Sequence, residues 1–506
     1  MAGARSLTIA EVRMIKALLD RRPRFSKQRV LSYFTRPDRD LNSRLMTEIA
    51  NGQRWATEPP ATPAEAEAFI EASAYHRPLA AEDFVDLSPA GGPRERKHIL
   101  YLDWWSAGQG LFASGMISRT GGAPLVWVYD CGTTSKAAIL TQSRKAFERQ
   151  FNRLNGQVIQ LAVLSHFDND HLSGLVKLLD VADIRILLLP YIPAWRRLAY
   201  ALDRGVDPDA PEFGFFLNPA AYLANVADGR IDRIVFVPPS QPGEAAPDIP
   251  EAPRLPSIGG EDFDEVPSKD LWVEEGAPPP SANGDEGAVS QSGLPVTFLQ
   301  PGGRIEASGL WEFVPYNDAE MAPRVSAADV AAIEALRDQL LQTPATRQSS
   351  LDALKAYYER LFPKTKERNL ISLFLYSGPV GRRYRLELCR SCHPEGLREP
   401  LRFSQMHTGD GYLEDDARLR AFEAHYRFED RLARSAVLQV MHHGSRENWH
   451  DGVAARLNPL WSIFSSDPMH KTYGHPHAEV LRDFWMHGPV QVDGDRRFHM
   501  HGWLKR

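Results

Sequence analysis

The sequence predicts a mixed α+β fold, because segments with strand character alternate with segments that carry apolar residues at helical spacing. Residues 158–164 ("VIQLAVL") form a run of Val, Ile and Leu that is typical of a buried strand. Leu172, Leu175 and Leu179 follow at helical spacing. The chain has 506 residues, 43% of them hydrophobic and 25% charged, so we expect a globular protein with two domains or large insertions.

The amino-terminal segment predicts a small basic helical module. Residues 8–11 form a capping box that opens an amphipathic helix, and two further helices are expected over 26–34 and 41–50. Through Arg54 the chain has 12 basic and 5 acidic residues. We therefore interpret residues 1–95 as a module that resembles a helix-turn-helix together with a Pro/Ala-rich linker.

Three arginines of this module are candidates for contact with nucleic acid. Arg36, Arg39 and Arg44 lie on or beside the third expected helix, where a helix-turn-helix protein makes its groove and phosphate contacts. Positive charge alone is not specific for nucleic acid. The alternatives are a helical extension that packs on the main domain and a module that binds a protein partner.

Residues 96–506 are expected to form the main domain, which two insertions interrupt. The segment 238–294 is rich in Pro and Gly, and residues 241–293 include 12 acidic and 2 basic side chains. Such a composition predicts a disordered acidic insertion, because it cannot bury a core. A second, helical insertion is expected over 320–365.

The chain shows no sequence signal for a membrane or for export. No apolar stretch approaches the roughly 20 residues that span a bilayer. The amino terminus lacks the apolar core of a signal peptide. Three cysteines, a small and odd number, fit a reducing compartment. We expect a cytoplasmic protein with no membrane association.

The segment "LSHFDNDHLSG" (164–174) gives the strongest functional signal in the chain. Its two histidines and two aspartates lie where a strand ends and a helix begins, a place where α/β folds expose functional side chains. Two carboxylates this close repel unless a cation compensates them, and His nitrogen and Asp oxygen are common ligands of Zn²⁺ and similar ions. We therefore predict a divalent metal site; the alternative is a polar loop that caps the helix. The four residues are His166, Asp168, Asp170 and His171.

This segment resembles the HxHxDH signature of the metallo-β-lactamase superfamily. It is more similar still to the SHxDxDH version in the soluble domain of ComEC-type DNA-uptake proteins. The resemblance covers about residues 98–506, outside the two insertions. Further segments resemble motifs of that family in the expected order: "WWSAGQGLF" (104–112), "VYDCG" (128–132), "NLISLFL" (369–375), "HTGD" (407–410), "VMHHGS" (440–445) and "YGHPH" (473–477).

The resemblance implies an αββα sandwich that holds two divalent metal ions, Zn or Mn. Asp410 would bridge the two ions, and Asp130 would orient metal ligands by contacting them without binding the ions itself. An ordinary turn aspartate is the alternative for Asp410. The implied metal ligands are His166, Asp168, Asp170, His171, Asp410 and His443.

Catalytic roles are expected for Asp170, His442 and His475. Strand alternation would point one of His442 and His443 into the cleft and the other away. The family pattern favours His443 as the metal ligand. His442 would then contact either a metal ligand or the substrate. His475 is suited to protonating a leaving group or holding a phosphate; a surface histidine is the alternative.

Two departures from the superfamily pattern affect the first metal site. Asp168 stands where most of the superfamily has histidine, although the ComEC-type proteins share this change. Its oxygen weakens the preference for Zn²⁺ and makes Mn²⁺ or Mg²⁺ more plausible. In addition, neither His393 nor His407 stands in a recognisable third-ligand motif, so we expect an open, weak or water-completed site.

The sequence thus predicts a metal-dependent hydrolase, with a phosphodiesterase or nuclease acting on DNA or another nucleic acid as the favoured activity. A first alternative is hydrolysis of a small ester, lactone or lactam by the same metals. A second is a DNA-binding regulator whose metal-containing domain senses a ligand. Protein partners and the physiological metal are left open.

Overall fold

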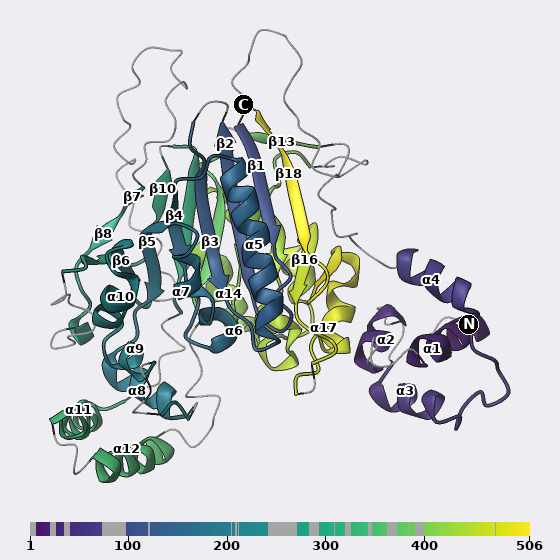
Figure 1. Cartoon of the computed structure of the whole chain (residues 1–506), viewed down its shortest axis with the longest axis horizontal. Coiled ribbons are helices and arrows are strands. Elements are labelled where there is room, and N and C mark those ends of the chain that lie inside the picture. Colours follow the sequence, from purple (N-terminus) through teal and green to yellow (C-terminus); the bar gives the residue numbers. More distant parts are fainter. Residues whose placement is uncertain are drawn as a thin grey trace, which may run out of the picture.

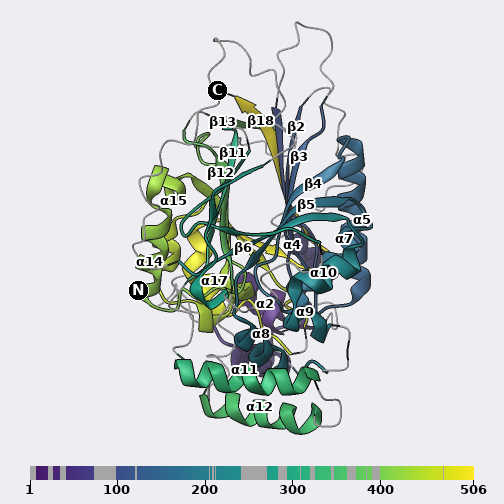
Figure 2. The same cartoon turned by 90° about the vertical axis from the view of Figure 1, so that its left-hand side faces the viewer.

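Two β-sheets pack face to face in the computed structural model, and helices cover both outer faces (Figures 1 and 2). This layering confirms the α+β fold and the α/β/β/α order of layers that we expected. The structure describes residues 7–20, 27–34, 41–72, 98–119, 122–203, 205–207, 210, 212–240, 271–282, 293–307, 309–318, 325–342, 347–361, 372–382, 384–389, 399–470 and 472–505.

The first sheet has ten described strands, of which β3, β4, β5, β6 and β9 run parallel. The predicted strand over 158–164 is β4 of this sheet. In spatial order the strands are β13 (Arg385–Leu388), β18 (Phe498–Lys505), β1 (His98–Trp104), β2 (Phe112–Arg119), β3 (Leu125–Cys131), β4 (Val158–Val163), β5 (Asp183–Pro190), β6 (Ile231–Val237), β9 (Val296–Leu299) and β8 (Glu275–Gly276).

The second sheet has eight described strands, of which β14 to β17 run parallel. Buried side chains from both sheets, including Trp104, Trp127 and Trp311, form the core between them. In spatial order the strands are β17 (Pro489–Val492), β16 (Trp461–Ser465), β15 (Ser435–Gln439), β14 (Ser404–His407), β12 (Phe374–Pro379), β11 (Trp311–Tyr316), β10 (Ile305–Ala307) and β7 (Trp272–Val273).

Helices pack on the outer faces through two further apolar clusters. On the first sheet they are α5 (Ala137–Arg153), α6 (Asn169–Leu172), α7 (Leu175–Leu178), α8 (Ala194–Asp203), α9 (Phe213–Leu217) and α10 (Pro219–Ala227), and α11 (Ala327–Gln342) and α12 (Arg347–Leu361) pack against α8. On the second they are α14 (Asp416–Tyr426), α15 (Arg431–Arg434), α16 (Val453–Leu457) and α17 (Ala478–Asp483). Short 3₁₀ turns are η2 (Pro280–Ala282), η6 (Phe428–Asp430), η7 (Met441–Gly444), η8 (Arg446–Asn448) and η9 (Phe484–Met486).

The amino-terminal module consists of short helices with their own apolar cluster beside α17 (Figure 1). The predicted capping box is present, since Glu11 N donates to Thr8 Oγ1 at 3.2 Å and Thr8 N donates to the Glu11 carboxylate at 2.8 Å. Ala478 of α17 belongs to the cluster, so the module packs on the main domain. Its helices are α1 (Ile9–Leu19), α2 (Lys27–Phe34), α3 (Ser43–Ala50) and α4 (Pro63–Ala72).

Part of the segment expected to be a disordered acidic insertion is ordered. Residues 271–282 form β7, β8 and η2, and the side chains of Val273 and Ala282 are buried. The expectation for 238–294 is therefore wrong for this stretch, because two very short strands extend the edges of both sheets. Residues 241–270 and 283–292 lie outside the described residues. The helices of the second insertion were expected, and they form α11 and α12.

Among the described helices, none combines the length and apolar character that crossing a bilayer requires.

Candidate metal centre

The centre lies where the carboxyl ends of parallel strands from both sheets meet. Asp130 is near the end of β3, and the segment 166–171 follows β4 in the first sheet. Asp410 follows β14 and His443 follows β15 in the second sheet. Since parallel strands end at the same edge of a sheet, side chains far apart in sequence converge there.

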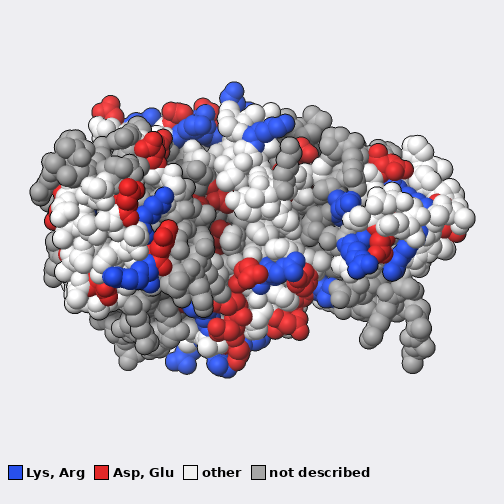
Figure 3. Space-filling view, turned by 90° about the horizontal axis from the view of Figure 1, so that it is seen from below, with Lys and Arg blue, Asp and Glu red and all other residues white. Residues whose placement is uncertain are grey.

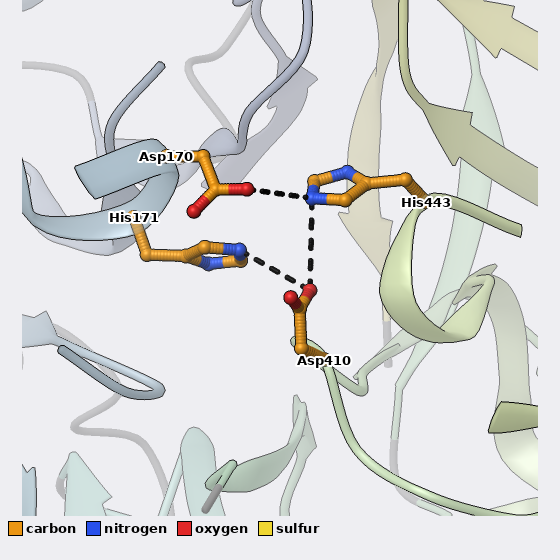
Figure 4. A group of neighbouring side chains, drawn as sticks. All are labelled: Asp170, His171, Asp410 and His443. Carbon is orange, nitrogen blue, oxygen red and sulfur yellow. Dashed lines mark hydrogen bonds and ion pairs between the residues drawn. The ribbon is translucent and has the colours of Figure 1, made fainter. Parts of the chain in front are cut away.

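Four side chains form the first group of metal-ligand atoms (Figure 4). His443 Nε2 lies 3.2 Å from Asp170 Oδ2 and 3.6 Å from Asp410 Oδ1. His171 Nε2 lies 3.2 Å from the same Asp410 oxygen. All four candidate ligand atoms lie within 4.8 Å of one another, which is close enough for one ion to contact them together. The group consists of Asp170, His171, Asp410 and His443.

A second group of ligand atoms shares Asp410 with the first. It consists of His166, Asp168 and Asp410, again within 4.8 Å of one another. His166 Nε2 lies 3.5 Å from Asp410 Oδ2 and 3.8 Å from Asp168 Oδ2. Asp410 therefore offers Oδ1 to one group and Oδ2 to the other, as a bridging carboxylate would.

The turn that presents Asp410 requires a glycine before it. Gly409 has φ +50°, and a Cβ there would lie 2.3 Å from Ser372 Oγ and 2.8 Å from Ser165 Cβ. Ser372 Oγ also accepts from the backbone N–H of Asp410 at 2.9 Å. The TGD segment is thus held against the loop that follows β4, which fixes where the carboxylate lies.

Each histidine of the two groups has its Nδ1 engaged and its Nε2 directed at carboxylates. His171 Nδ1 donates to Asp130 Oδ2 at 2.6 Å, and His443 Nδ1 donates to the carbonyl oxygen of Ser465. His166 Nδ1 lies 2.9 Å from Ser165 Oγ, whose hydroxyl donates to Asp130 at 2.7 Å. This is the arrangement of metal-ligating histidines, in which a partner of one nitrogen orients the other towards the ion.

His442 also faces the centre, contrary to the expected alternation. Its Nε2 lies 3.2 Å from Asp410 Oδ2, and its Nδ1 lies 2.8 Å from Asn448 Oδ1. His442 and His443 have φ 43° and 59°, so they form a left-handed turn after β15. The expectation that one ring points away was wrong, because alternation applies only to extended backbone.

Charge balance makes this site suited to a cation. Burial alone would raise the pKa of Asp170, but His171 and His443 hold it below its ordinary value. Burial alone would lower the pKa of His171, but Asp130, Asp410 and Asp170 raise it well above its usual range. In the absence of an ion, protons on buried imidazoles therefore compensate the carboxylates.

Three buried atoms of the centre have no hydrogen-bond partner among the described residues. They are His166 Nε2, His171 Nε2 and Asp410 Oδ1. Unsatisfied polar atoms at this depth cost free energy unless something outside the protein satisfies them. With nitrogen and carboxylate donors at ligand spacing, the residues present fit one or two divalent ions.

The predicted His475, and His407 for which no ligand role was predicted, have different surroundings. His475 lies after β16, and its ring centroid is 5.5 Å from that of His442 and 6.2 Å from that of His443. Burial lowers the pKa of His475 to about 2. His407 is stacked between Tyr129 and Trp104, with ring centroids 4.4 and 5.4 Å away, and belongs to neither group of ligand atoms.

The other residues named from the sequence do not belong to the centre. Arg36, Arg39 and His393 lie outside the described residues. Arg44 is on α3, where its side chain is 86% exposed and its Nε lies 2.9 Å from Glu48 Oε1. Its expected contact with nucleic acid remains a prediction.

Sequence reasoning missed Tyr200. Its hydroxyl donates to Oδ1 of Asp168 from helix α8, more than 30 residues further along the chain. No local motif surrounds Tyr200, so only the packing of α8 reveals the contact. Ser165 and Asn448, which anchor His166 and His442, stand inside or beside quoted motifs and were within reach of the sequence.

Comparisons with known proteins leave the family open. No protein-family model matches the chain, and no curated protein matches it. Among solved structures, the long form of RNase Z from yeast is similar, with a TM-score of 0.26 and 11% sequence identity. The match covers 80% of this chain and 43% of the RNase Z chain, so this chain spans less than half of that protein. A likeness this weak decides neither family nor activity.

Proposed function

We propose that this protein is a metal-dependent hydrolase that cleaves phosphodiester bonds in nucleic acid. The observation that carries the proposal is the pair of ligand groups that share Asp410 through its two oxygens. Shared carboxylates of this kind are typical of two-metal sites that act on phosphate esters. The resemblance of the sequence motifs to ComEC-type soluble domains supports the same chemistry.

Divalent ions bound there would activate a water molecule and neutralise charge on the phosphate oxygens. The protein's own residues would hold the ions and orient the ligand side chains. Asp130 fixes the His171 ring through its Nδ1, and the carbonyl oxygen of Ser465 fixes the His443 ring through its Nδ1. His442 is 32% exposed beside Asp410, so it can contact a substrate. Burial lowers the pKa of His475, so its ring is neutral in the free protein and can donate its N–H to a phosphate oxygen.

Nucleic acid is the proposed substrate because basic side chains lie on the same face as the centre. Figure 3 shows acidic side chains in a recess near the middle of this face and in a larger group beside it, with Lys and Arg side chains and a few acidic ones over the amino-terminal helices to one side. Phosphates repelled by the carboxylates would be attracted by these cations. The carboxylate oxygens of Asp168, Asp170 and Asp410 favour Mn²⁺, and the imidazole nitrogens of the same two groups also suit Zn²⁺.

A panel of substrates tests the proposed activity. Protein loaded with Mn²⁺ or Zn²⁺ should cleave single- or double-stranded DNA, or RNA, and a chromogenic phosphodiester, and Asp170→Ala should abolish cleavage. Hydrolysis of a lactone or a β-lactam without phosphodiester cleavage would instead assign the small-molecule activity. Binding of DNA with no hydrolysis of any substrate would favour the regulator.

A further inference from the structure

We propose that Tyr200 is a positioning residue for the metal ligand Asp168, and that the helical insertion fixes it in place. The inference rests on the proposed function, since it concerns how one metal site is built. Asp168 stands where an imidazole is usual in the superfamily that the motifs resemble. An imidazole ligand is oriented through its second nitrogen, and a carboxylate ligand needs an equivalent partner for its second oxygen.

The two oxygens of Asp168 have different neighbours. Oδ1 accepts from the hydroxyl of Tyr200, whereas Oδ2 lies on the side of His166, 3.8 Å from its Nε2. Asp168 thus presents one oxygen towards the ligand group while the phenol holds the other. This parallels the histidines of the centre, whose Nδ1 atoms are held by Asp130, Ser165 and Ser465.

An aromatic cluster fixes the position of the Tyr200 ring. Tyr200 is 2% exposed and stacks on Phe216 of α9, with ring centroids 6.1 Å apart. Phe167, which separates the ligands His166 and Asp168 in sequence, packs edge-on against Phe215 at 4.9 Å and Phe216 at 6.3 Å. The loop that carries the ligands and the helix that carries Tyr200 therefore share one buried cluster.

The helical insertion packs against α8. The buried hydroxyl of Tyr358 in α12 donates to the backbone carbonyl of Trp195 in α8. Ile333 of α11 and Leu354 of α12 belong to the same apolar cluster as Tyr200. A contact chain therefore runs from the insertion through α8 to Asp168, which gives the insertion a role at the centre.

Tyr200→Phe tests the proposal, because it removes one oxygen atom and keeps the ring in its cluster. Titration of metal-free protein with Mn²⁺ should show one of the two ions bound 10–100-fold more weakly, as for other groups that orient metal ligands. Tyr222→Phe is the matched control. Tyr222 packs edge-on against Phe215 at 5.7 Å in the same region, and it makes no described contact with the ligands. Its substitution should leave both ions unaffected.

Two further measurements separate positioning from general structural support. The melting temperature of metal-free Tyr200→Phe should fall by only a few degrees, the cost of one hydrogen bond, whereas the rise on adding Mn²⁺ should be clearly smaller than in the wild type and the Tyr222→Phe control. In an Asp168→Asn background, Tyr200→Phe should cause no further loss of metal affinity, because the two residues act through one ligand.

Equal metal affinity in Tyr200→Phe and wild type would overturn this inference and leave the metal site intact. Equal weakening of both ions, with a metal-free melting temperature far below what the loss of one hydrogen bond explains, would also overturn it, because Tyr200 would then support only the fold. Wild-type protein that binds no Mn²⁺ would instead overturn the proposed function itself, and this inference with it.

Discussion

His442 Nε2 lies 3.2 Å from Oδ2 of Asp410, so two consecutive histidines face the same carboxylate. His442 nevertheless stands in neither group of mutually close ligand atoms. It is also far more exposed than His443, at 32% against 1% of the side chain. From these differences we expect His443 to be a metal ligand and His442 to act on the substrate side of Asp410.

Replacing His442 should therefore separate catalysis from metal binding. We expect His442→Gln to lower kcat by about 100-fold or more, the usual effect of losing a group that assists proton transfer, while metal content stays at the wild-type level. His443→Gln is the matched comparison and should lose metal. Loss of an ion from His442→Gln would show that His442 is a ligand instead.

The buried His407 should make stability depend on pH. Burial lowers the pKa of His407 to about 3 from an ordinary value of 6.5. Below about pH 6.5, His407 therefore binds a proton in the unfolded chain but stays neutral in the folded chain. The contribution of His407 to the free energy of unfolding is fully present well above pH 6.5 and is lost as the pH falls. For one such histidine the free energy of unfolding is lower by about 2 kcal/mol at pH 5.

His407→Phe should remove this contribution, because the new ring fits between Tyr129 and Trp104 and does not titrate. Chemical unfolding in the presence of a chelator, at pH 7.5 and pH 5, measures it without interference from bound metal. The free energy of unfolding should fall less between the two values in the variant than in the wild type. An equal fall in the free energy of unfolding of wild type and variant would show that groups other than His407 cause the pH dependence.

The ordered stretch 271–282 should be needed for the fold, whereas 241–270 should not. Replacing 241–270 by a short Gly/Ser linker should shift the melting temperature by only a few degrees, because its Pro- and acid-rich composition cannot bury a core. Val273→Asp should lower it strongly, since that side chain is buried beside β10. Similar melting temperatures for Val273→Asp and wild type would show that β7 contributes nothing.

The basic amino-terminal module should matter for long substrates and not for small ones. Replacing Arg36, Arg39 and Arg44 by Ala should reduce the cleavage of long DNA and make that cleavage less dependent on salt concentration. The rate of hydrolysis of a small chromogenic phosphodiester should not change. Lys145→Ala with Arg149→Ala, on the exposed surface of α5, is the control. A parallel loss of both activities would mean that the arginines support the fold. No loss at all would favour a protein partner for the module.

Much of the centre could be predicted because its ligands stand in short local patterns. Residues 166–171 and the TGD turn carry their chemistry in adjacent positions, and a clear apolar run precedes the first of them in β4. The strand before the TGD turn, β14, has the sequence SQMH and shows no such run. Tyr200 could not be predicted, because it reaches Asp168 only through the packing of α8. The direction of His442 depends on a left-handed backbone that alternation does not describe.

The edges of the sheets were harder to predict than their centres. Strands β7 and β8 each span two residues, too few for a periodic pattern to appear, and their neighbours in sequence are rich in Pro and acid. The helical insertion was predicted because α11 and α12 are long enough to show helical periodicity. Its contact with α8 could not be predicted.

The metal content of two aspartate variants measures whether two metal ions share Asp410. Asp410 belongs to both groups of ligand atoms, whereas Asp170 belongs to one. Elemental analysis of protein equilibrated with Mn²⁺ should find close to two ions per chain in the wild type. Asp170→Ala should retain about one ion, and Asp410→Ala should retain less than Asp170→Ala. Wild-type protein without bound metal, or an Asp410→Ala variant that keeps both ions, would contradict the account.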